Sequence, residues 1–160
     1  MPKPLIRLLA VLATVGLIAS LGAGAAAAAA PQATEVYRLS LTGDQEATPT
    51  CAPPAVCGDP DAGGEMILIV NPNNDTVCFL TRWRDIDGTV VAAHIHTGVA
   101  GVPGGVVVPL FAGQFAGTDQ LRACVAGNGW TDDINANPAG FYVNIHSTTY
   151  QAGAIRAQLG

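Results

Sequence analysis

The feature that most constrains this chain is a period-two alternation of apolar and polar residues, repeated in short runs. Alternate side chains of a strand point to opposite faces, so such runs are typical of half-buried β-strands. Residues that favour turns (Gly, Pro, Asn and Asp) separate the runs. The eight runs are Glu35–Thr42, Gly64–Val70, Thr76–Trp83, Val90–Thr97, Gly105–Phe111, Gln120–Val125, Gly140–Ser147 and Gly153–Leu159.

Eight short strands predict an all-β domain, an antiparallel Greek-key sandwich or barrel. The turn cluster "NPNND" between the second and third runs predicts that these two strands form a hairpin. One short helical turn is expected at Thr131–Asn137, with Thr131 or Asp132 as its cap and Pro138 at its end.

The N-terminus has the pattern of a secretory signal peptide. Lys3 and Arg7 precede an apolar run from Leu8 to Leu21, and an alanine-rich tract with several A-x-A sites follows. We therefore expect residues 1–30 to be removed, leaving a secreted protein with no stable membrane insertion. The remainder, 31–160, is expected to be a single domain.

Charge restricts the partners of the mature chain. Without the leader, five arginines and no lysine face twelve acidic residues, a net charge of −7. Such a chain is a poor match for nucleic acid or anionic membranes, so neither is expected as a partner. Oligomeric state is not predicted.

Four cysteines in an exported chain indicate disulfides. Three pairings are possible, and we favour Cys51–Cys57, which closes the short loop "CAPPAVC", together with Cys78–Cys124, which links two strand-like segments. A thiolate metal site is the competing interpretation, but no C-x-x-C spacing supports it.

All three histidines of the chain fall near strand ends. His94 and His96 are two residues apart in one predicted strand, so both side chains point to the same face, and Ile95 points to the other. In the run 140–147 the same rule places Tyr142, Asn144 and His146 together on one face.

Three ordered motifs resemble the CHRD domain, which is named from chordin and is also found as a stand-alone secreted domain in bacteria. They are "LTGDQEATP", "AAHIHTGVAGVPGGVVVPL" and "NPAGFYVNIHSTTYQAGAIRAQL". The resemblance implies a β-sandwich of immunoglobulin-like or superoxide-dismutase-like build, without an agreed activity. Two positions depart from the family pattern: a proline is displaced to Pro49, and Ala157 replaces a glycine.

Two interpretations of His94, His96 and His146 stay open. Neutral imidazoles that converge bind copper or zinc, so the three residues are candidate metal ligands of a non-enzymatic binding module. Alternatively, each ring only makes structural hydrogen bonds in an extracellular structural or adhesive module. Arg156, Asn144 and Tyr142 are further candidate site residues, because they lie in the same motifs.

A metal-dependent redox enzyme is the contrasting hypothesis. Superoxide dismutase shares an H-x-H strand and a late arginine comparable to Arg156, but three histidines cannot build its two-metal centre. Arg156 is alternatively expected to pair with a carboxylate such as Asp85 or Glu46. Other partners remain open, including an extracellular protein or ligand.

The acidic loop residues match no fixed calcium-binding pattern and are predicted to form a solvated surface. They are Asp44, Glu46, Asp59, Asp61 and Glu65. Trp83 and Trp130 are predicted to pack in or around the core rather than to bind sugar.

Overall fold

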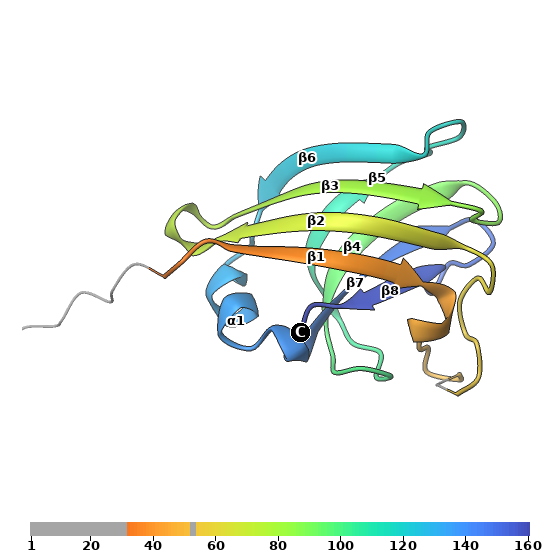
Figure 1. Cartoon of the computed structure of the whole chain (residues 1–160), viewed down its shortest axis with the longest axis horizontal. Coiled ribbons are helices and arrows are strands. Elements are labelled where there is room, and N and C mark those ends of the chain that lie inside the picture. Colours follow the sequence, from red (N-terminus) through yellow and green to blue (C-terminus); the bar gives the residue numbers. More distant parts are fainter. Residues whose placement is uncertain (1–31, 52–53) are drawn as a thin grey trace, which may run out of the picture.

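The computed structural model of the chain describes residues 32–51 and 54–160 (Figure 1). The predicted signal peptide lies outside the described residues. Among those described, no helix is both long and apolar enough to cross a bilayer.

Eight strands form one antiparallel sheet, and each coincides with a predicted run to within two residues at either end. The strands are β1 (Glu35–Thr42), β2 (Gly63–Asn71), β3 (Thr76–Arg84), β4 (Val90–Thr97), β5 (Val106–Ala112), β6 (Gln120–Ala126), β7 (Phe141–Ser147) and β8 (Ile155–Gln158). Their order across the sheet is β5-β4-β7-β8-β1-β2-β3-β6. The hairpin expected between β2 and β3 is present.

The sheet curls until its two end strands, β5 and β6, contact each other without a hydrogen-bonded ladder. With β6 beside β3 and β7 beside β4, the path is a Greek key. This order differs from that of a constant-type immunoglobulin domain, in which the third strand joins the second sheet. Here β3 stays beside β2.

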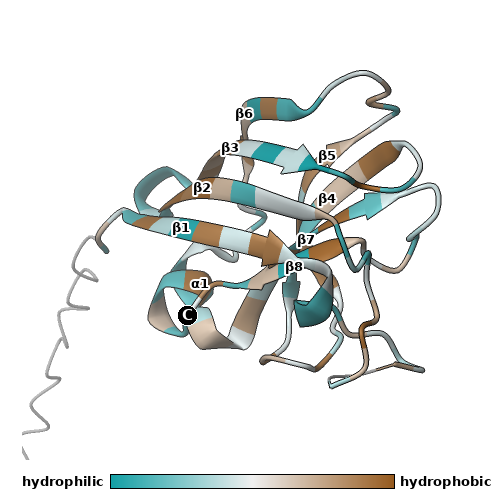
Figure 2. Cartoon of the chain, turned by 45° about the vertical axis from the view of Figure 1, so that its right-hand side comes forward, coloured by the Kyte–Doolittle hydropathy of each residue, from teal (hydrophilic) through white to brown (hydrophobic). Residues whose placement is uncertain are grey.

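We call β5-β4-β7-β8 the covered half of the sheet and β1-β2-β3-β6 the open half. The two halves meet at β1 and β8, where a single residue pair, Thr42 with Arg156, is in register. Their inner faces enclose the hydrophobic core, to which Leu68 and Phe79 contribute from one half and Ile95 and Val143 from the other. Figure 2 shows the alternation of hydropathy along β1 that underlies this packing.

Both disulfides form as predicted. Cys78 on β3 bonds to Cys124 on β6, and the two residues lie directly opposite each other in the ladder. Cys51 bonds to Cys57 in the loop that precedes β2.

The helix α1 (Thr131–Ala136) begins where it was predicted and ends one residue earlier. Its predicted cap was wrong: Trp130 occupies the cap position and makes no side-chain cap hydrogen bond. Thr131 instead donates a hydrogen bond to Asp75, 3.0 Å away. Ile134 anchors the helix because it is fully buried in the core.

Candidate functional site

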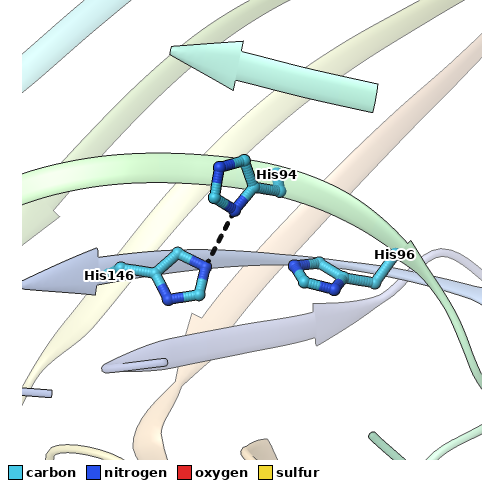
Figure 3. A group of neighbouring side chains, drawn as sticks. All are labelled: His94, His96 and His146. Carbon is cyan, nitrogen blue, oxygen red and sulfur yellow. Dashed lines mark hydrogen bonds between the residues drawn. The ribbon is translucent and has the colours of Figure 1, made fainter. Parts of the chain in front are cut away.

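The three histidines come together on the outer face of the covered half. His94 and His96 extend from β4, and His146 extends from the adjacent strand β7 (Figure 3). Their ring centroids lie 4.9 Å apart for His94 and His146, 5.6 Å for His94 and His96, and 6.0 Å for His96 and His146. One ligand atom from each ring can be chosen so that all three lie within 4.8 Å of one another.

Irregular pairing of β5 with β4 accompanies this arrangement. The register between the two strands shifts once between Ala93 and His94 and again between Ile95 and His96. Each shift inserts an extra residue in β5, and such bulges re-aim neighbouring side chains. Pro109 is tolerated in β5 because this strand ends the hydrogen-bonded sheet.

Backbone carbonyls fix two of the three rings. His96 Nδ1 lies 3.0 Å from the Gly104 carbonyl oxygen, and His146 Nδ1 lies 3.0 Å from the Gln151 carbonyl oxygen. A carbonyl oxygen only accepts hydrogen bonds, so each Nδ1 donates and each neutral ring keeps its lone pair on Nε2. His94 Nδ1 then donates to His146 Nε2 over 3.1 Å.

His96 Nε2 is buried and has no hydrogen-bond partner among the described residues. Buried polar atoms without partners are rare, and each one calls for an explanation. This lone pair and the one on His146 Nε2 belong to rings whose orientation is already fixed. The two nitrogens are therefore two of the three candidate metal ligands, and each of these two rings carries the outer hydrogen bond typical of histidine ligands.

The site keeps its imidazoles neutral near pH 7. Burial, together with repulsion from His146 and His96, lowers the pKa of His94 to about 4. Burial also lowers the pKa of His96 and His146, although their hydrogen bonds to Gly104 and Gln151 act in the opposite direction. Neutral imidazole is the form that binds a metal ion.

The cluster is open to solvent on one side. His94 is half-buried, whereas His96 and His146 are only 7% and 8% exposed. A shallow depression exposes parts of all three rings, and its other lining residues are Val91, Ala92, Val106, Ser147, Thr148 and Gln151. An ion held by the three nitrogens would therefore keep access to a further small ligand.

Tyr142 and Asn144 lie in the same outer layer as the histidines, as strand alternation predicted, and Arg156 on β8 lies there too. The Tyr142 ring stacks on His96 at 4.8 Å between centroids with an interplanar angle of 7°, and its hydroxyl accepts a hydrogen bond from the Gly104 amide. Asn144 is buried, and its Nδ2 donates to Glu46 Oε2 over 3.5 Å.

The expected pairing of Arg156 with a carboxylate was wrong. Its guanidinium donates to the carbonyl oxygens of Val99 and Val102 instead, at 2.9 and 3.1 Å. Asp85 forms an exposed ion pair with Arg84, the only salt bridge found within residues 32–51 and 54–160. Arg156 thus holds the loop that precedes β5, and this loop supplies the Gly104 carbonyl to His96.

The predicted acidic surface needs a second correction. Glu46 and Asp59 are fully buried, whereas Asp44, Asp61 and Glu65 are exposed. Sequence reasoning missed the burial because these residues lie in loops, where no periodicity reports which side is covered. It also missed the carbonyl partners of His96 and His146. The glycine-rich loop after β4 was the only signal for Gly104, the partner of His96, and nothing signalled Gln151, the partner of His146. Trp83 packs into the core against Phe111, as predicted.

Comparison with known proteins gives one match. A family model described as CHRD domain matches residues 37–159. No curated protein matches the chain, and no solved structure does.

Proposed function

The chain belongs to the CHRD domain family, and on that basis we propose that it is a non-enzymatic binding module whose three histidines hold one transition-metal ion, copper or zinc. The ligand atoms would be His94 Nδ1, His96 Nε2 and His146 Nε2. The observation that carries this proposal is the buried lone pair of His96 Nε2, which has no partner within the described residues.

The spacing of the nitrogens supports the proposal. Metal–nitrogen bonds of about 2 Å place two ligand nitrogens roughly 3.5 Å apart. His94 Nδ1 and His146 Nε2 are already 3.1 Å apart, and one nitrogen from each of the three rings can be chosen so that all three lie within 4.8 Å of one another. His94 has the most freedom to adjust, because its ring is half-exposed and no backbone carbonyl holds it.

Binding would replace the hydrogen bond between His94 and His146. The His94 proton would move from Nδ1 to Nε2, and the ion would occupy the space between the two rings. The neutral tautomers therefore accommodate an ion without net proton release near pH 7. A set of three imidazoles suits copper and zinc rather than calcium or magnesium, which prefer oxygen ligands.

An extracellular location fits the same proposal. Two disulfides are typical of oxidising compartments, and the N-terminal sequence predicts export. We expect the exported protein to begin within Ala25–Ala33, as measured by N-terminal sequencing. Recovery of the intact N-terminus in a membrane fraction would contradict this expectation.

Metal retention tests the central proposal. The protein would be loaded with Cu(II) or Zn(II) at pH 7.5, desalted, and analysed by inductively coupled plasma mass spectrometry. We expect about one ion per chain, and release only as the pH falls toward about 4, because burial lowers the pKa of all three histidines and protons therefore compete for the imidazoles only below the ordinary histidine range. Alanine at His94, His96 or His146 should reduce retention at least ten-fold, as expected for loss of one ligand.

Val106→Ala is the matched control, because Val106 lines the same depression and offers no ligand atom. This variant should retain the ion. Absence of bound ion from the parent protein, combined with loss of stability in the histidine variants, would favour the structural interpretation. Metal-dependent turnover, such as superoxide removal, would instead favour the redox-enzyme hypothesis.

A further inference from the structure

Arg156 is a buried cation, and no carboxylate is bonded to it within the described residues. Arg156 is 1% exposed, and among these residues its guanidinium donates only to neutral oxygens: the carbonyls of Val99 and Val102, and Gln158 Oε1 at 3.1 Å. Glu46 is the carboxyl group whose charge acts on Arg156 within the described residues, and burial raises the pKa of Glu46 to about 7. Near neutral pH, Glu46 therefore compensates the positive charge only in part.

This charge lies close to the three-histidine cluster. The Arg156 Cζ atom is 3.4 Å from the centroid of the Tyr142 ring, on which His96 also stacks. Strand β7 lies between β4 and β8, so the Tyr142 ring separates His96 from Arg156. Repulsion from Arg156 also contributes to the lowered pKa of His96, after the larger effect of burial.

A positive ion bound by the histidines would experience the same repulsion. The three ligands are neutral, and the cluster contains no carboxylate or thiolate that would offset the charge of the ion. Coulomb repulsion is proportional to the charge of the ion, so Arg156 opposes a doubly charged ion twice as strongly as a singly charged one. Imidazole binds copper as well as zinc, and copper alone of the two has an accessible +1 state.

We propose that Arg156 sets the charge selectivity of this site and favours Cu(I) over divalent ions such as Zn(II). The inference rests on the proposed metal-binding function and adds the class of ion. Arg156 acts through its charge, across the Tyr142 ring, and is not a metal ligand.

The test compares the affinity of each protein for two ions. Cu(I) affinity would be measured by competition with bicinchoninate in ascorbate under nitrogen, and Zn(II) affinity by competition with 4-(2-pyridylazo)resorcinol, both at pH 7.5 and constant ionic strength. In Arg156→Gln, which removes the charge, Zn(II) binding should tighten more than Cu(I) binding. The ratio of Cu(I) to Zn(II) affinity should fall roughly ten-fold.

Two variants separate charge from structure. Arg156→Lys keeps the charge but not the planar hydrogen-bonding group, so the affinity ratio should stay within three-fold of the parent. Arg122→Gln removes the same charge from the exposed face of β6 and should also leave the ratio unchanged. If Arg156 acted only through structure, both Arg156 variants would bind Cu(I) and Zn(II) more weakly, and the ratio of the two affinities would not change.

A fourth variant keeps the proposal testable if Arg156→Gln does not fold. Glu46→Gln removes the nearby negative charge and should raise the ratio two- to three-fold, because the repulsion from Arg156 is then uncompensated. An unchanged or opposite ratio in Arg156→Gln or Glu46→Gln would overturn the inference while metal binding stands. A parent protein that binds neither ion would refute the proposed function itself.

Discussion

The two halves of the sheet use the same strand alternation in different ways. In the open half, inward residues are buried and outward residues are exposed, as in β3, where buried Phe79 and Trp83 alternate with exposed Leu80 and Arg82. In the covered half, every residue of β7 is buried. Here the outward side chains of β7 and β8 form a second buried layer, whereas β5 at the end of the sheet keeps exposed residues.

Polar side chains in this second layer are removed from water, so each needs a hydrogen-bond partner or a bound ligand. His96, His146, Asn144 and Arg156 all lie there, and Glu46 reaches the layer from the loop after β1. On the outer face of the open half, four arginines remain in solvent: Arg38 on β1, Arg82 and Arg84 on β3, and Arg122 on β6. The comparison teaches that the candidate ligands lie at the edge of this second buried layer, where a depression keeps the histidines accessible, and that the open half mainly supports the core.

The largest expected effect concerns the open half, which lacks a covering layer and relies on a covalent link. Replacing Cys78 and Cys124 by serine should lower the free energy of unfolding by roughly 4 kcal/mol, because the bond closes a long loop. The same change at Cys51 and Cys57 should cost about 2 kcal/mol, because that loop is short. Urea denaturation measures both values.

Metal retention should survive both disulfide replacements in the fraction of protein that stays folded. The contrast between the two halves would be contradicted if both replacements lowered the free energy of unfolding equally. It would also be contradicted if the variant without the Cys78–Cys124 bond no longer retained the ion.

The next effect concerns Glu46 in the covered half. Its pKa of about 7 exceeds the ordinary value of 4.5, because burial disfavours the ionised form. The protonated Glu46 carboxyl therefore stabilises the folded state fully below about pH 4.5, and this contribution is lost as the pH rises through about 7.

From pH 5 to pH 8, the parent should therefore lose roughly 2 to 3 kcal/mol of unfolding free energy relative to Glu46→Gln. Thermal or urea denaturation at several pH values measures the difference between the two proteins, in which the histidine contributions cancel. If the unfolding free energies of the parent and of Glu46→Gln changed in parallel with pH, the pKa of Glu46 would not be raised in solution.

A smaller effect is expected in the loop that covers the histidines. A Cβ atom at Gly104 would collide with the Thr97 carbonyl oxygen, whereas one at Gly105 would meet nothing within 4 Å. Gly104→Ala should cost about 2 kcal/mol and weaken metal retention, because the displaced carbonyl no longer orients His96. Gly105→Ala should change neither property, and equal behaviour of the two variants would contradict the role of the loop.

The smallest effect is expected on the outer face of the open half. Leu80 is 41% exposed there, and Leu80→Thr should change the unfolding free energy by less than about 1 kcal/mol without affecting metal retention. A loss of several kcal/mol in denaturation would show that this face is also covered in solution.

Much of this arrangement could be predicted from the sequence, because strand alternation is a local property. The eight strands, the disulfide partners and the common face of His94 and His96 all follow from short patterns. The partners of Arg156 and the burial of Glu46 could not be predicted in this way. They depend on how loops fold over the sheet, and the hydrogen-bonding groups involved are backbone carbonyls, which carry no residue identity.

The single residue pair that joins β1 to β8 has a consequence for the order of folding events. Strands β1, β2 and β3 are sequential antiparallel neighbours, whereas the pairing of β4 with β7 and of β8 with β1 closes longer loops and is therefore slower. Arg156 belongs to the pair at this junction, and His94 and His146 meet only when β7 reaches β4. Ion binding should therefore be among the last properties that a refolding chain acquires, which makes it a sensitive reporter of complete folding.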